Sequence, residues 1–161
     1  MATPRVEALL ARLEKGHSKT MEIFAALTPQ QWAQVIYDAP HVWRARELLA
    51  HFVSSEEALL QLAQDVAAGG PGAAPDFDYD AFNAQEQERL KGRAPADLLA
   101  ALDRARRATL DWVRTLDVGA LDRVGRHPAL GEVTLETMII AIYGHQLMHM
   151  QDLRARLAPQ S

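Results

Sequence analysis

The chain has 161 residues, 48% hydrophobic and 24% charged, which is the balance of one soluble globular domain spanning residues 1–161. Its net charge of −4 and its scattered Lys and Arg residues argue against a nucleic-acid partner, because nucleic acids select basic surfaces. The lack of cysteine excludes disulfides, thiolate ligands and iron–sulfur clusters. Because the sequence shows no apolar leader and no apolar segment of membrane length, we expect a cytoplasmic protein that does not bind membranes.

Apolar residues recur at three-and-four spacing in four long segments, which predicts four long helices. The first begins at Thr3-Pro4, a capping residue followed by proline, and extends to about residue 27. A short helix is expected next, from Thr28 to about Tyr37, because residues 28–31 have the pattern of a capping box. The second long helix runs from about Val42 to Ala68 and is stopped by the glycine-rich residues 69–72.

The second half of the chain predicts two more long helices. A short helix is expected over residues 80–90, and the third long helix begins near Pro95 and reaches Leu116. Residues 117–133 contain three glycines and a His-Pro pair, so we expect mostly loop there and no strand alternation of useful length. Thr134 caps the final helix, which ends before Pro159.

These elements predict an all-α protein, most simply a four-helix bundle with short extra helices in its connections. The connection between the second and third long helices, about residues 69–94, is long enough to cross the bundle. An up-down-down-up topology therefore competes with a simple up-down-up-down arrangement.

Two histidines four residues apart mark the final helix as a candidate metal site. At about 100° per residue, His145 and His149 lie within roughly 40° of each other and about 6 Å apart along the axis. Both replace apolar residues on the stripe that faces the core, where a buried imidazole needs a partner. One divalent cation could satisfy both rings. The alternative is two ordinary hydrogen-bonded histidines, because Gln146 stands where the metalloprotease motif has Glu.

His51 strengthens the metal hypothesis, because it lies on the otherwise apolar stripe of the second long helix. Alone, such a histidine is more often structural. Three uncompensated buried imidazoles would be costly, whereas three neutral nitrogens around Zn²⁺ with an open fourth position form a known catalytic arrangement. The sequence therefore predicts a divalent metal held by His51, His145 and His149.

Three further residues are weaker candidates for catalysis. His17 lies on the first helix's stripe and is a possible fourth ligand or base, or a half-exposed residue at the edge of the core. Asp152 and Glu47 each lie near a predicted ligand, where they could orient a histidine or bind metal; otherwise both are surface acids, Asp152 with Arg156 at i+4. His41 and His127 stand beside prolines in expected loops, and we expect both to be solvent-exposed.

The final helix is apolar most of the way round. Ile139, Tyr143 and Leu147 extend its apolar surface beyond the histidine stripe, as do their neighbours Ile140 and Met150. Such a helix is either central or covered by a partner. A homodimer formed through this helix is therefore expected, with cover by the long loops as the alternative.

Two segments resemble a known family. Residues 42–51, Val-Trp-Arg-Ala-Arg-Glu-Leu-Leu-Ala-His, are similar to the second helix of the DinB-like (YfiT-like) proteins. Thr134-Leu135, followed by residues 144–153 with their His-x-x-x-His pair, resembles the closing helix of that family. The resemblance extends over nearly the whole chain, including the middle connection with Phe82-Asn83.

The resemblance implies an up-down-down-up four-helix bundle, often dimeric, with nickel or zinc on His51, His145 and His149. It also implies the family's range of activities: bacillithiol- and mycothiol-dependent S-transferases, a maleylpyruvate isomerase and some hydrolases. We therefore expect a metal-dependent enzyme with a small-molecule substrate and a low-molecular-weight thiol as cosubstrate. The cation would activate the thiol or a water molecule. Hydrolysis is the second expectation, and a non-catalytic metal- or ligand-binding bundle is the alternative from another class.

Overall fold

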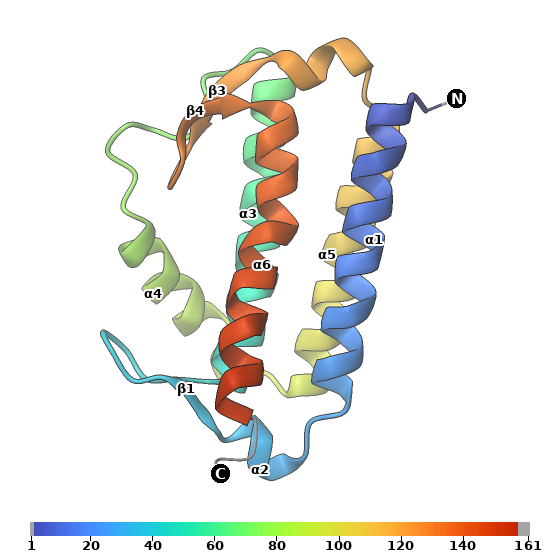
Figure 1. The fold of residues 1–161 in the computed structure, drawn as a ribbon. Helices are drawn as coiled ribbons and strands as arrows, with labels where there is room; N and C mark the ends of the chain where they lie inside the picture. The colour runs from blue at the N-terminus through green and yellow to red at the C-terminus, as the bar shows by residue number, and fades with distance from the viewer. Residues whose placement is uncertain (1, 158–161) are drawn as a thin grey trace.

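Four long helices form the body of the molecule, for which a computed structural model describes residues 2–157 (Figure 1). They are α1 (Pro4–Ala25), α3 (Ala45–Ala67), α5 (Pro95–Arg114) and α6 (Leu135–Leu157). Local sequence explains where they begin, because α1 and α5 carry proline in the first turn and the Thr3 hydroxyl caps α1. The four predicted long helices are confirmed, with their ends shifted by a few residues. Pro159, the expected stop signal of α6, lies outside the described residues.

The helices follow an up-down-down-up path. Figure 1 shows α1 descending, α3 and α5 both ascending, and α6 descending beside α3. Helix α1 packs on α5 and α6, and α3 packs on the same two helices. Because α3 and α5 are parallel, residues 68–94 must return along the whole bundle, and this connection carries α4 (Tyr79–Arg89). The predicted bundle and its up-down-down-up topology are confirmed.

Two small hairpins correct the expectation that the chain has no strands. The first pairs β1 (Val35–Tyr37) with β2 (Trp43–Arg44), so the short helix α2 (Pro29–Trp32) ends earlier than predicted and α3 begins later. The second pairs β3 (Val124–His127) with β4 (Gly131–Thr134), after a short 3₁₀ helix, η1 (Val118–Asp122). Strands of two to four residues are too short for alternating polarity to show in the sequence.

The β3–β4 hairpin anchors the start of the long connection. Arg126 of β3 donates its backbone N–H to Pro71 O at 2.9 Å and accepts from Ala73 N at 2.8 Å. Between these bonds lies Gly72 with a φ of +84°, where a Cβ atom would approach Arg126 O to 2.5 Å. Only glycine fits this position.

The apolar core forms two clusters, one toward each end of the bundle. One contains Phe24, Leu48, Phe52, Leu102 and Leu153, and the other contains Leu13, Val66, Val113, Leu121 and Leu135. Buried polar side chains, among them Glu56, Arg106, Thr109 and Gln146, belong to the middle turns of the long helices, and His51 belongs to the second turn of α3. The bundle is therefore held by apolar packing at its ends and contains a polar layer at half height.

The outer surface of α6 remains partly apolar, with Leu147 39% and Met148 55% exposed. The structure contains one chain, so the homodimer stays a prediction. Within residues 2–157, no helix combines the length and the hydrophobicity needed to cross a membrane.

Candidate metal centre

Three imidazoles from two antiparallel helices meet in the polar layer. His51 of α3 and His145 of α6 approach to 2.9 Å between their Nε2 atoms, and His149 Nε2 lies 3.1 Å from His145 Nε2. One ligand atom from each ring lies within 4.8 Å of the others. The spacing of four residues places His145 and His149 on one face of α6, opposite His51. The structure thus brings together the three residues that the sequence singled out.

The cluster favours neutral rings. Burial, followed by the repulsion of the neighbouring imidazoles, lowers the pKa of His51 to about 2. Burial likewise lowers the pKa of His145 to about 4 and, in direction, that of His149, where nearby Asp152 opposes the shift. Neutral imidazoles carry the free lone pair that a metal ligand needs.

The donor set fits a divalent cation. Three Nε2 atoms converge, and the neutral rings can satisfy one another only by sharing N–H groups, whereas one cation would bind all three lone pairs. Three imidazoles at one point suit zinc or nickel, and among residues 2–157 no other His, Asp or Glu joins the group.

A tyrosine and a carboxylate fix the orientation of His149. Tyr37 Oη lies 2.7 Å from His149 Nδ1 and 2.5 Å from Asp152 Oδ2. The phenol has a single proton, and a carboxylate can only accept, so Tyr37 donates to Asp152 and accepts from His149 Nδ1–H. This arrangement leaves the Nε2 lone pair of His149 directed at the cluster. Burial, followed by the bond to Asp152, raises the pKa of Tyr37, which keeps the phenol protonated.

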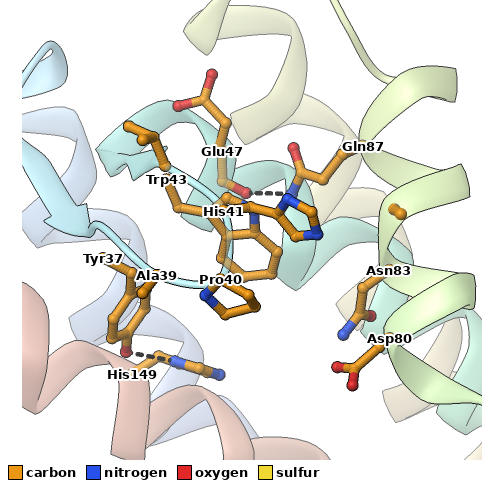
Figure 2. Close-up of a pocket in the computed structure, with 12 residues that line it drawn as sticks. Tyr37, Ala39, Pro40, His41, Trp43, Glu47, Asp80, Asn83, Gln87 and His149 are labelled. Atoms are coloured by element: carbon orange, nitrogen blue, oxygen red, sulfur yellow. Dashed lines mark hydrogen bonds between the residues drawn. The ribbon is translucent and has the colours of Figure 1, made fainter.

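Tyr37 was absent from the sequence-based candidates. It belongs to β1 and meets α6 only because the first hairpin folds back against that helix, 112 residues away in sequence. Figure 2 shows its hydroxyl beside the His149 ring. The only sequence signal was a tyrosine at the end of a short apolar run, which is too common to identify a site.

The weaker candidates lie around the cluster and do not join it. Asp152 acts on His149 through Tyr37, which supports its expected orienting role. Glu47 accepts the backbone N–H of Arg44 at 2.9 Å and so caps the start of α3. His17 Nε2 lies 3.0 Å from Asp103 Oδ1 of α5, so that ring is bonded to a neighbouring helix.

The two loop histidines differ from each other. His41 is exposed, as expected. The expectation for His127 was wrong: its residue is only 9% exposed, and burial lowers its pKa. Its Nδ1 accepts the backbone N–H groups of Ala129 and Leu130, which close the β3–β4 turn. The ring is buried because residues 124–134 form a hairpin against the bundle, whereas the sequence predicted a loop.

A pocket of about 430 Å³ opens beside the cluster. The first hairpin forms one wall through Tyr37 and residues 39–43, and α4 forms the opposite wall through Asp80, Asn83 and Gln87 (Figure 2). His149 contributes to the lining, so one metal-ligand candidate is reached directly from this cavity. A small molecule in the pocket would therefore lie against the three-histidine cluster.

A second buried polar cluster lies next to the first. Glu56 of α3 accepts two hydrogen bonds from Arg106 of α5, at 2.7 and 2.9 Å, and both side chains are fully buried. Thr109 and Gln146 each donate a further bond to Glu56 at 2.8 Å, and Arg106 also donates to Leu13 O. We refer to Glu56, Arg106, Thr109 and Gln146 as the Glu56 network. The sequence contains one indication of this network: a charged residue, Arg106, stands next to Ala105 of the apolar stripe.

A comparison with models of known protein families assigns the chain to one family. A family model described as the DinB superfamily matches residues 7–153. The chain therefore belongs to the DinB superfamily, as the resemblance of its histidine segments indicated. No protein of curated function matches the sequence at a significant level.

Solved structures share the fold at low sequence identity. YfiT from Bacillus subtilis, described as a probable metal-dependent hydrolase with an unusual four-helix bundle topology, matches with a TM-score of 0.74 and 20% identity over 98% of this chain and 90% of its own. A mycothiol-dependent maleylpyruvate isomerase matches with a TM-score of 0.73 and 18% identity, over 95% of this chain but only 62% of its own. The colibactin self-resistance protein ClbS, solved with a double-stranded DNA, matches with a TM-score of 0.70 and 17% identity over 98% of this chain and 100% of its own. At these identities the likeness shows the fold.

Proposed function

We propose that this member of the DinB superfamily is a metal-dependent enzyme that transfers a small thiol to a small electrophile. One divalent cation, zinc or nickel, would be held by His51, His145 and His149. The observation that carries the proposal is the convergence of three neutral Nε2 atoms beside an open pocket. The net charge of −4 agrees with a small-molecule substrate and argues against a nucleic-acid partner.

The number of ligands supports a catalytic role over a structural one. Structural zinc sites are closed by four protein ligands, whereas catalytic sites have three and keep one position open. In the described part of the chain the cluster has three members, and the pocket reaches it at His149. A bound cation would supply Lewis acidity, lowering the pKa of a thiol or water molecule beside it.

The chain's own residues would position the reactants. Tyr37 and Asp152 hold the His149 ring in one tautomer, while the Trp43 ring packs against His51 with centroids 4.9 Å apart. The first hairpin and α4, which form the two walls of the pocket, would enclose the substrate. In the proposed reaction a sulfur–carbon bond forms as the bond from carbon to its leaving group breaks, and the thiol proton departs with that group.

Thiol transfer and hydrolysis differ in the support they receive. A mycothiol-dependent relative with the same fold favours thiol chemistry, although this chain covers only 62% of it. The description of YfiT as a probable metal-dependent hydrolase supports hydrolysis as the second candidate. A non-catalytic bundle that only binds metal or ligand is the remaining alternative, and activity assays separate it from both.

The first experiment measures metal in protein purified without a histidine tag. Elemental analysis should find about one zinc or nickel per chain in the wild type and almost none in His149→Ala. His41→Ala is the matched control, because it removes an exposed histidine outside the cluster and should retain the metal. Equal, near-zero metal in the wild type and His149→Ala would end the proposal.

The second experiment separates the reactions. Chlorodinitrobenzene with mercaptoethanol reports thiol transfer, since a sulfur–carbon bond replaces the carbon–chlorine bond and releases chloride and the thiol proton. Nitrophenyl acetate reports hydrolysis. We expect metal-dependent turnover in the first assay that His149→Ala lacks. Turnover in the ester assay alone would favour the hydrolase, and metal without turnover in either would favour the non-catalytic bundle.

A further inference from the structure

The pocket beside the three histidines has an acidic, amide and aromatic lining, and none of the described residues that line it is Lys or Arg. We propose that it selects a substrate bearing a protonated amine, held between Asp80 of α4 and the indole of Trp43. This inference deepens the proposed function, because it names the charge of the substrate that would reach the same site.

The two carboxylates of the pocket differ in how far they are already neutralised. Glu47 accepts the backbone N–H of Arg44 and lies 3.5 Å from the Arg46 guanidinium. Asp80, in the first turn of α4, has no ion pair or hydrogen bond from any side chain in residues 2–157. Figure 2 shows its carboxylate on the α4 side of the cavity, facing the hairpin. Asp80 is therefore the negative charge that a ligand would meet.

The amides of α4 add acceptor oxygens. Gln87 uses its Nε2 to donate to the backbone oxygen of Glu47 at 2.8 Å, which leaves its side-chain carbonyl free to accept. Asn83 lies between Asp80 and Gln87 along the same face of the helix (Figure 2). One ammonium group could donate to Asp80 and to Asn83, which are one helical turn apart, whereas Gln87 lies two turns from Asp80 and would contact another part of the ligand.

Aromatic rings form the opposite wall. The rings of Trp43 and Tyr37 lie edge to face, with centroids 6.3 Å apart, and both line the pocket. The face of an indole attracts organic cations through its quadrupole, an attraction that strengthens when the cation is partly desolvated. A carboxylate in the same place would meet Asp80 and the π faces without a compensating positive side chain.

The test compares three probes of equal length that differ in charge: butylammonium, butanol and butyrate. Binding to the full chain is followed by the NMR signal of the Trp43 indole N–H, once with zinc added and once after treatment with EDTA. In the EDTA-treated sample, butylammonium should bind about 10-fold more tightly than butyrate, whereas added zinc attracts the carboxylate and should lower this ratio. Asp80→Asn should reduce this ratio to about 2-fold.

Asp76→Asn is the control, because it removes the same charge from an exposed loop residue outside the pocket lining and should leave the ratio unchanged. In the EDTA-treated sample, equal affinities for the three probes, tighter binding of butyrate, or a ratio that Asp80→Asn does not alter would overturn the inference. The EDTA-treated sample contains no metal, so this result stands apart from the metal analysis that tests the proposed function.

Discussion

Helices α3 and α6 each contribute to two buried polar clusters that differ in how their polar groups are paired. In the Glu56 network, a carboxylate meets a guanidinium, a hydroxyl and an amide, so that both charged groups are paired inside the protein. In the three-histidine cluster, similar nitrogens face one another at 2.9 and 3.1 Å. The first cluster is complete within this chain, whereas under the proposed function a cation completes the second.

Under the proposed function, this contrast separates a cluster that stabilises the fold from one that binds the cation. A buried ion pair is tolerated when hydrogen bonds satisfy its remaining lone pairs and protons, as they do around Glu56 and Arg106. Neutral imidazoles placed together gain nothing comparable from one another. Because His145 and Gln146 are adjacent in α6, the closed network also holds the helix rotation that directs His145 at His51.

Glu56→Ala, which removes the central carboxylate of the Glu56 network, should have the largest effect on stability. The substitution leaves the Arg106 guanidinium fully buried without its carboxylate, so the free energy of unfolding should fall by about 3–5 kcal/mol. Denaturant unfolding of the metal-free protein measures the loss.

Glu57→Ala is the matched control for this prediction. Glu57 is the next residue along α3, but its side chain is 46% exposed and its ion pair with Arg89 lies at the surface. We expect a change below about 1 kcal/mol. Similar losses for both variants would mean that the Glu56 network is not a special support of the bundle.

Tyr37→Phe tests the three-histidine cluster. The variant keeps the ring but removes the hydroxyl that accepts from His149 Nδ1 and donates to Asp152. Loss of such an outer partner typically weakens metal binding 10–100-fold, which we expect here for zinc in competition with a chromophoric chelator. The stability of the metal-free protein should change much less than in Glu56→Ala.

Tyr79→Phe serves as its control, because Tyr79 is 52% exposed and does not line the pocket. It should bind zinc like the wild type. If Tyr37→Phe also bound zinc like the wild type, the hydrogen bonds from Tyr37 would have no part in orienting His149.

The sequence predicted what depends on helical spacing and missed what depends on contacts between segments distant in sequence. His145 and His149 share a face wherever residues 135–157 are helical, and His51 lies on the core stripe of its own helix. Tyr37 reaches His149 only through a hairpin whose strands are too short to produce a pattern. The pairing of Glu56 with Arg106 likewise depends on α3 and α5 being parallel neighbours, which periodicity within each helix does not encode.

A substitution of His17 tests to which of the two clusters this residue belongs. We expect its effect to be the smallest of those considered. Burial lowers its pKa below the usual 6.5, with Arg106 acting in the same direction, while Asp103 and Glu56 oppose the shift. As the pH falls below about 6.5, the unfolded chain takes up a proton that the folded protein does not. The wild type should therefore lose up to about 1.4 kcal/mol of stability per pH unit from this residue, until the pH reaches the lowered pKa of the folded state.

The variant His17→Gln should lack this part of the acid sensitivity and bind zinc like the wild type. Unfolding curves of both metal-free proteins between pH 7 and pH 5 measure the first effect as a difference in slope, in which the carboxylates and the other histidines largely cancel. Chelator competition measures the second. Parallel slopes would show that the folded protein protonates His17 as readily as the unfolded chain does. Zinc binding weakened 10-fold would instead assign His17 to the metal centre, although Arg106 and Glu56 of the other cluster are the buried charges that act on its pKa.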